Sequence, residues 1–205
     1  MKNVKNILAV YNQATEKEKE DGLAWYRKAY CFCEDNARKY GVSVDVVVAV
    51  ISALSPRNHW VNNLKDTVTV LQAVKDGKGP DDVGVGTFHN NKRKAFEIVQ
   101  TGNTALVVGQ KTVSFIDNIK YLNSEMVTVD IHAYSIYNGQ VTSAKKITPK
   151  EYNKVAESYR KAAKIAGITP SEMQAITWHT YRRMIKVRQW TNEYTEQLEN
   201  GRVAA

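Results

Sequence analysis

The chain has 205 residues, of which 43% are hydrophobic, and its net charge is +8. This length and apolar content suffice for one sizeable core, in one domain or in two lobes that share a cleft. No run approaches the ~20 apolar residues that a membrane span needs, and the first residues lack the apolar core of a signal peptide. We therefore expect a soluble, intracellular protein of the cytoplasm with no membrane partner.

Cysteine and histidine are too sparse for metal chemistry. Cys31 and Cys33 are the only cysteines, and residues two apart on a helix point in different directions. We expect both to be reduced packing residues. The four histidines are scattered and offer no cluster of ligands, so we expect no metal and no cofactor.

The first third of the chain predicts three helices. Residues 3–13 carry a modest apolar face, and the charged stretch TEKEKEDG is expected to interrupt it. Residues 21–40 follow as a long helix ended by Gly41, with an apolar side that begins at Leu23. Ser43 can cap a third helix over 44–54. Its valine run would also suit a buried strand, but no second run of that kind is available for pairing.

Pro56 stops that helix and opens a loop that contains Arg57, Asn58, His59 and Trp60. A loop with an arginine, an amide and an aromatic could fill the gap that an extruded base leaves in a duplex. The alternative is a surface turn anchored by Trp60. Another helix is expected over 62–75, and residues 76–87, rich in Gly, Asp and Pro, form the clearest loop.

Lys111 and Asp130 are the two candidate catalytic residues. A short apolar turn ends at Gly109 and leads into a helix that begins near Lys111, with apolar residues recurring from Val113 to Leu122. Helix starts favour acids, and their partial positive charge favours the neutral, nucleophilic amine. Asp130 begins another helical segment 19 residues later. An amine and a carboxylate so placed can converge on one cleft, although an Asp there can also be a simple N-cap and Lys111 a solvated residue.

Two further helices are expected to start at Thr148-Pro149 and Thr169-Pro170. In the second, Gln174, Trp178 and Arg182 follow one another at intervals of four residues and can project together. An aromatic at such a position can equally well belong to the core.

The excess positive charge lies late in the chain. Between Val141 and Trp190 eleven Lys or Arg stand against three Glu, a difference of eight that equals the net charge of the whole chain. Such a block suits a polyanion and would make its binding salt-dependent. The alternative is a solvated helix face.

Several of these motifs together resemble the helix-hairpin-helix DNA glycosylases, the superfamily of endonuclease III and 8-oxoguanine glycosylase. The resemblance is carried by the following segments: Val108-Gly109-Gln110-Lys111-Thr112, Val129-Asp130-Ile131-His132, Phe88-His89-Asn90-Asn91-Lys92, Ile51-Ser52-Ala53-Leu54-Ser55-Pro56 and Gln174-Ala175-Ile176-Thr177-Trp178. These segments run in the family's order and cover about residues 44–185. The pattern departs from the family where Leu106 and Val107 replace the first hairpin proline and glycine. No cysteine follows Asp130, so an iron–sulfur cluster is not expected.

The resemblance implies an all-α fold of two helical lobes with the hairpin at their cleft. The expected central lobe is about 44–125, and the second lobe is 1–43 plus 126–195. It implies a bifunctional DNA glycosylase and AP lyase in which Lys111 forms a Schiff base and Asp130 stabilises the developing charge. The resemblance also implies that the base is bound by Gln174, Trp178 and His132. The residues it implies for DNA binding are Arg57, Asn58, His59, Trp60, Asn91, Lys92, Gly109, Gln110, Thr112, Arg182 and Arg183.

The expected partner is double-stranded DNA, bound by a monomer. Two alternatives stay open. The fold can serve transfer or tailoring chemistry on a modified base, in which case Asp130 is needed and Lys111 is not. The chain can also be a non-catalytic DNA-binding module.

Overall fold

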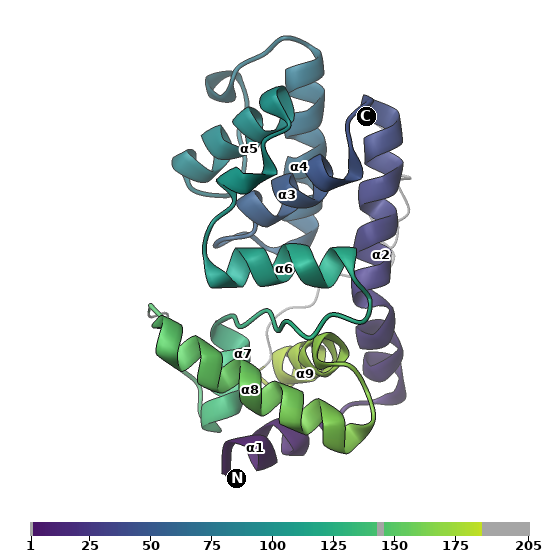
Figure 1. Ribbon diagram of the computed structural model, residues 1–205, viewed down its shortest axis with the longest axis vertical. Coiled ribbons are helices and arrows are strands. Elements are labelled where there is room, and N and C mark those ends of the chain that lie inside the picture. The colour runs from purple at the N-terminus through teal and green to yellow at the C-terminus, as the bar shows by residue number, and fades with distance from the viewer. Residues whose placement is uncertain (1, 143–145, 186–205) are drawn as a thin grey trace. The chain divides into compact units, whose positions relative to one another are not determined.

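The protein is all-α in the computed structural model, as predicted (Figure 1). The structure describes residues 2–142 and 146–185, and within these ranges there are nine α-helices, two 3₁₀ turns and no β-strand. The elements are α1 (Lys2–Tyr11), α2 (Glu16–Tyr40), α3 (Val44–Leu54), α4 (Trp60–Lys75), η1 (Pro80–Asp82), α5 (His89–Thr101), η2 (Thr104–Leu106), α6 (Gln110–Lys120), α7 (Ile131–Asn138), α8 (Pro149–Ala166) and α9 (Pro170–Met184). Among the described helices, none combines the length and apolar character that crossing a bilayer requires.

The chain divides into two compact units. Unit 1 contains the described residues of Met1–Arg27 and Asp117–Gln189, and unit 2 those of Lys28–Ile116. Helices α2 and α6 contribute residues to both units. The predicted lobes divided the chain near residues 43 and 125, and residues 186–195 of the second predicted lobe lie outside the described part.

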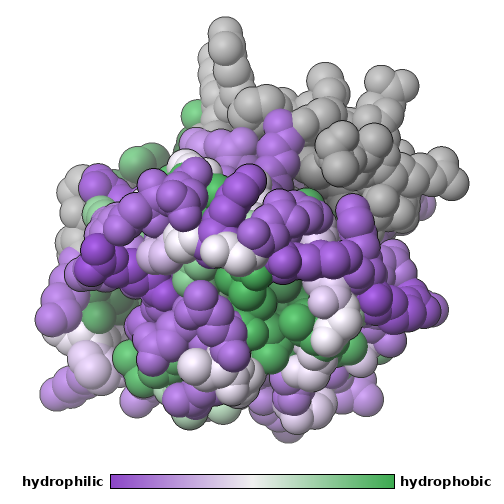
Figure 2. Space-filling model, turned by 90° about the horizontal axis from the view of Figure 1, so that it is seen from above, coloured by the Kyte–Doolittle hydropathy of each residue, from purple (hydrophilic) through white to green (hydrophobic). Residues whose placement is uncertain are grey.

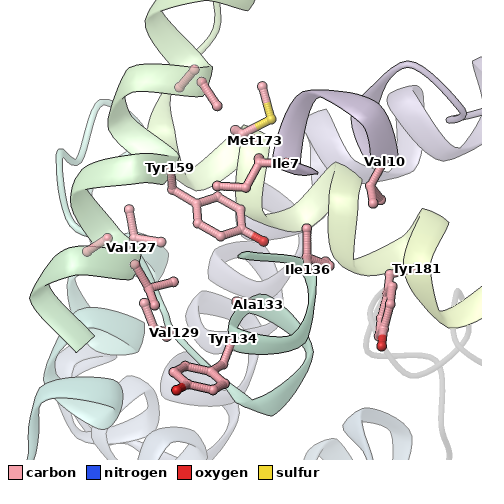
Figure 3. Packing of buried hydrophobic residues seen from close by; sticks show 14 of the residues in the cluster. Ile7, Val10, Val127, Val129, Ala133, Tyr134, Ile136, Tyr159, Met173 and Tyr181 are labelled. Atoms are coloured by element: carbon pink, nitrogen blue, oxygen red, sulfur yellow. The ribbon is translucent and has the colours of Figure 1, made fainter. Parts of the chain in front are cut away.

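Unit 1 is built from α1, α7, α8 and α9, which pack against one another in pairs. Its core is formed by apolar side chains from all four helices and from the segment before α7. The fully buried ring of Tyr159 lies among Ile7, Val127, Ala133 and Ile136 (Figure 3). A fully buried aromatic of this size contributes a large part of the hydrophobic stabilisation of such a small core.

The starts of α8 and α9 confirm the predicted caps. Thr148 accepts a hydrogen bond from the backbone N–H of Glu151, and the Glu151 carboxylate accepts one from the backbone N–H of Thr148. Thr169 and Glu172 form the same reciprocal pair at the start of α9. Each capping box satisfies two backbone donors that a helix start would otherwise leave unpaired.

In unit 2, α3, α4 and α5 pack against one another. Every residue of α3 from Val46 to Leu54 is buried, so this part of the helix is covered on all sides. The valine run is therefore helical, as predicted, and Ser43 caps it by accepting a hydrogen bond from the backbone N–H of Val46.

Several local predictions are wrong. The helix expected at residue 21 already begins at Glu16, because Thr15 and Glu18 form a reciprocal cap in the charged stretch that we expected to interrupt the apolar face. Some side chains expected in the core are exposed because periodicity alone does not show where a neighbouring helix ends. These residues are Leu23 (46% exposed), Val113 (41%) and Leu122 (56%).

Gly22 allows α2 to approach α9 closely. A Cβ atom built at residue 22 would lie 2.4 Å from Cγ1 of Ile176 and 2.7 Å from its backbone N and Cα. The backbone atoms cannot rotate away as a flexible side chain could. A glycine inside a helix lowers helix propensity by about 1 kcal/mol relative to alanine, and here that cost is offset by close helix packing.

We expect Gly22→Ala to destabilise unit 1 by about 1–3 kcal/mol, since the overpacking outweighs the gain in helix propensity. Urea unfolding of the parent and the variant measures the difference. Gly84→Ala is the matched control, because a Cβ at residue 84 meets nothing within 4 Å. Equal stability of the Gly22→Ala variant and the parent would show that the two helices separate without cost.

Candidate functional site

Asp130 lies at the N-terminus of α7, and both of its carboxylate oxygens accept hydrogen bonds. Oδ1 accepts from the backbone N–H of Ala133 at 2.8 Å, which makes Asp130 the N-cap. Oδ2 accepts from the indole Nε1–H of Trp178 at 3.1 Å. The side chain is half-buried. A simple cap would need only the first contact, and the second one fixes the orientation of the carboxylate towards α9.

Arg182 lies against the face of Trp178, with its guanidinium carbon 4.2 Å from the ring centroid. The side chain is half-buried and has no hydrogen-bond acceptor or ion-pair partner among the residues that the structure describes. Burial lowers the pKa of Arg182, and the negative charge of Asp130 opposes that shift. The guanidinium therefore stays charged, with N–H donors available for a ligand.

Trp178 is part of a group of aromatic rings. The rings of Trp25 and His132 lie 6.5 Å and 6.4 Å from it, and His132 lies 5.8 Å from Tyr181. His132 is thus part of the aromatic group, as the base-binding prediction requires. Because Arg182 covers one face of Trp178, only the remaining surface of that ring is available to a base.

Gln174 is buried and bound to the protein itself. Its Oε1 accepts a hydrogen bond of 2.9 Å from the hydroxyl of Tyr26, and only 6% of the residue is exposed. Burial, and to a lesser degree the negative charge of Asp130, raises the pKa of Tyr26 and Tyr159 far above the ordinary value, so both hydroxyls remain protonated. Neutral hydroxyl groups therefore lie within the electrostatic influence of Asp130. The prediction that Gln174 reads a base stays open, with only its amide nitrogen left for that task.

The segment before Asp130 is fixed by a buried polar network. The side chain of Asn118, which is fully buried, donates to Ser124 Oγ and to the Met126 carbonyl and accepts from Thr128 Oγ1. The Tyr152 hydroxyl accepts from the backbone N–H of Val129 at 3.1 Å. These contacts hold the irregular backbone before Asp130 in one position next to the Asp130 carboxylate.

Arg183, predicted to bind DNA, makes an ion pair within unit 1. Its Nε and terminal nitrogen donate to the two carboxylate oxygens of Glu18 at 2.7 Å and 3.1 Å, and it also donates to the Gln13 carbonyl. Burial raises the pKa of Glu18, but the hydrogen bonds from Arg183 and Thr15 and the charge of Arg183 together bring it below the ordinary value. A structural role therefore competes with DNA binding at this residue.

We expect Glu18→Gln to lower the free energy of unfolding at pH 7 by about 1–2 kcal/mol, since it breaks a charged, bidentate contact. Because the pKa of Glu18 is lowered on folding, its contribution is complete above the ordinary glutamate value and is lost as the pH falls below it. The difference between parent and variant, measured by urea unfolding from pH 7 to pH 3, should therefore shrink towards acid. The exposed Glu20→Gln is the control, and a difference independent of pH would contradict the assignment.

Lys111 lies in the first turn of α6 in unit 2, as predicted. The helix begins at Gln110, and Gly109 before it has φ of +105°, a conformation that strongly favours glycine. Thr112 donates from Oγ1 to the Val108 carbonyl at 2.9 Å, which closes the turn. Lys111 is half-buried and has no hydrogen bond or ion pair with any described residue. Its amine is therefore available for chemistry.

The loop after α3 has a strained backbone. Arg57 has a φ of +58° and is the only described residue other than glycine with a positive φ. Its guanidinium lies over the ring of Phe88. Asp66 holds the loop by accepting hydrogen bonds from Asn58 Nδ2 and from the backbone N–H of Gly86. Backbone strain of this kind costs about 1–3 kcal/mol and persists where the surroundings enforce it, often at functional sites.

The other unit 2 residues predicted to bind DNA have different environments. His59 is the exposed N-cap residue of α4, whereas the ring of Trp60 is half-buried and meets Phe115 edge to face. Asn91 donates to Thr87 Oγ1, and Lys92 donates to the Val83 carbonyl. Asn91 and Lys92 therefore support the loop before α5, and their DNA contacts stay predictions.

The face of the molecule seen in Figure 2 is mainly hydrophilic. On the face seen in Figure 2, hydrophilic residues surround a central hydrophobic area. Within the late basic block, Arg160 and Lys161 form exposed ion pairs with Glu157 on α8. Lys145, Lys186 and Arg188 of that block lie outside the described residues. On α8 these two residues therefore lie on a solvated helix face, where both are paired with Glu157.

The structure brings together five of the predicted residues in unit 1: Asp130, His132, Gln174, Trp178 and Arg182. Sequence reasoning did not identify Trp25 or Tyr26 as site residues, although both belong to this group. The adjacent pair of large aromatics on α2 was the available signal. No group of three or more His, Cys, Asp or Glu that could hold a metal occurs among the described residues. Of the two cysteines, Cys33 is buried whereas Cys31 is exposed, so the packing role predicted for Cys31 is wrong.

The chain belongs to a sequence family described as "Family of unknown function (DUF7178)", which matches residues 1–185. No curated protein and no solved structure matches it.

Proposed function

We propose that the protein is a DNA glycosylase with AP lyase activity, which excises a damaged or modified base from double-stranded DNA. The observation that carries the proposal is the pair of contacts at Asp130. One oxygen caps α7 and the other accepts from Trp178, beside an arginine with available donors. A carboxylate that is fixed in orientation yet half-exposed is suited to stabilising a positive charge that develops on a substrate.

The target base must first leave the duplex, which costs a few kcal/mol of stacking and pairing. In unit 2, the exposure of Arg57 on a strained turn supports its proposed contact with the opened duplex. Asp66 holds this turn by a hydrogen bond from Asn58. Trp178 and His132 offer aromatic surface for the extruded base, and the amide nitrogen of Gln174 offers a donor.

Asp130 stabilises positive charge on the deoxyribose as the glycosidic bond lengthens, and the base departs with the bonding electron pair. After losing a proton to solvent, the amine of Lys111 forms the new bond to the anomeric carbon. Loss of a proton from that nitrogen and opening of the sugar ring give a Schiff base. Removal of a proton from the adjacent sugar carbon then expels the 3′ phosphate by β-elimination, and water releases the enzyme.

The test is a panel of DNA duplexes, each carrying one damaged or modified base, incubated with the pure protein. Base release and abasic-site cleavage are scored separately. We expect one class of base to be released and the strand to be cut. Release without strand cleavage would remove the lyase step, and conversion of the base without release would favour tailoring chemistry. Binding with neither reaction would leave a DNA-binding module and end the proposal.

A further inference from the structure

We infer that Arg182 binds a phosphate group of the nucleotide on which Asp130 acts, so that a deoxynucleoside monophosphate is the smallest ligand of this site. The inference rests on the proposed function, because it takes Asp130 to act at the sugar. It goes further by naming the anion-binding residue and the minimal substrate.

The first argument is the state of the Arg182 side chain. A guanidinium has five N–H donors, and a half-buried one normally directs some of them to carboxylates or carbonyls. Arg182 has no such acceptor among the described residues, and its ordered contact is the face of Trp178. Arg183, the next residue, shows the contrast, since its donors are taken by Glu18 and Gln13. The free donors of Arg182 point to an acceptor that comes with a ligand.

The second argument is that one side chain positions both groups. The Trp178 indole N–H holds Asp130 Oδ2 at 3.1 Å, while the Trp178 ring face carries the guanidinium at 4.2 Å from its centroid. The carboxylate therefore lies at the edge of the indole ring and the guanidinium lies on its face. In a nucleotide, the anomeric carbon and the phosphate are separated by the sugar, so a ligand that meets both groups has a cationic sugar at one end and an anionic group at the other.

The third argument concerns the type of anion. A planar guanidinium pairs with phosphate through two parallel hydrogen bonds, and stacking on an aromatic ring fixes its plane in advance. Neighbouring Asp130 repels an anion that approaches too closely, so the phosphate is expected at the donors directed away from the carboxylate. Asp130 thus orients the nucleotide, with its phosphate at Arg182 and its sugar towards Asp130.

Calorimetric titration of the full chain with deoxynucleoside monophosphates, the matching deoxynucleosides and inorganic phosphate tests this inference. We expect monophosphates to bind about 10–100-fold more tightly than nucleosides, which is the range for a charge-assisted bidentate contact. Arg182→Gln should remove that difference, and Arg182→Lys, which keeps the charge without the planar fork, should remove most of it. Arg38→Gln, which removes an exposed arginine paired with Asp35 on α2, is the control of equal charge.

A second arm uses DNA with a stable abasic analogue and a neutral methylphosphonate at one phosphate beside it. Neutralising the contacted phosphate should weaken binding of the parent but leave the Arg182→Gln variant unaffected. The inference is overturned if the monophosphates do not bind, or if they bind equally well to the parent and to Arg182→Gln. Arg182-dependent nucleotide binding without base excision would overturn the proposed function and leave the inference standing. Base excision with no Arg182 dependence in either arm would overturn the inference and leave the proposed function standing.

Discussion

Lys111→Gln is expected to abolish the covalent adduct that borohydride traps between the protein and its DNA substrate. A glutamine amide is not a nucleophile, so no Schiff base forms and reduction has nothing to trap. The substitution should leave the fold intact, because Lys111 is half-buried at the start of α6 and contacts no described residue by hydrogen bond or ion pair. The measurement is the band of the reduced adduct on a denaturing gel.

Lys164→Gln, which removes the same charge from an exposed position on α8, is the control and should trap as well as the parent. Base release in the Lys111→Gln variant needs a separate measurement. If release continues at the parental rate while trapping is lost, Lys111 serves only the lyase step. If the variant still traps at the parental level, another amine is the nucleophile and the assignment is wrong.

The parts of the fold that could be predicted are those determined by a few neighbouring residues. Ser43, Thr148 and Thr169 were identified as helix starts because a hydroxyl there can accept from a backbone N–H three residues later. Gly41 was identified as a helix end for the complementary reason, since it adopts the left-handed conformation. Such contacts lie within one turn of helix and need no knowledge of the rest of the chain.

Predictions failed where a residue depends on a distant element. Gly22 lies inside the predicted helix, but nothing local showed that the position requires glycine, because only the backbone of Ile176 explains why a side chain is excluded there. Leu23, next to it, fits the apolar period of α2 and is nevertheless 46% exposed. Periodicity states which residues share a face but not which part of that face another helix covers.

The candidate site shows the same limit. The spacing of Gln174, Trp178 and Arg182 predicted that they follow one side of a helix, and α9 contains all three. Their roles differ because their partners come from other elements. Gln174 is bound by Tyr26 from α2, and Trp178 is bound by Asp130 from the start of α7. A helical stripe predicts neighbours along one helix, whereas the contacts that define chemistry here join residues 48 and 148 positions apart.

Asp130→Asn is expected to slow base release by about 100–1000-fold, the usual cost of losing one preorganised electrostatic contact to a transition state. The neutral amide cannot stabilise a cationic sugar as a carboxylate does. Binding to DNA should persist or improve slightly, because the variant removes a negative charge that repels phosphate. Single-turnover base release and equilibrium binding, measured on the same duplex, separate the two effects.

The substitution also has a structural consequence that the control must measure. Asp130 uses both oxygens as acceptors, from Ala133 N–H and from Trp178 Nε1–H, whereas an asparagine has one oxygen and must turn its NH₂ towards one of these donors. We expect a loss of about 1 kcal/mol in the free energy of unfolding for that reason. Trp178→Phe removes only the indole donor and keeps the carboxylate and an aromatic face for Arg182. If Trp178→Phe slows base release as much as Asp130→Asn does, the orientation of the carboxylate is as important as its charge. If Asp130→Asn releases the base at the parental rate, Asp130 is only a helix cap.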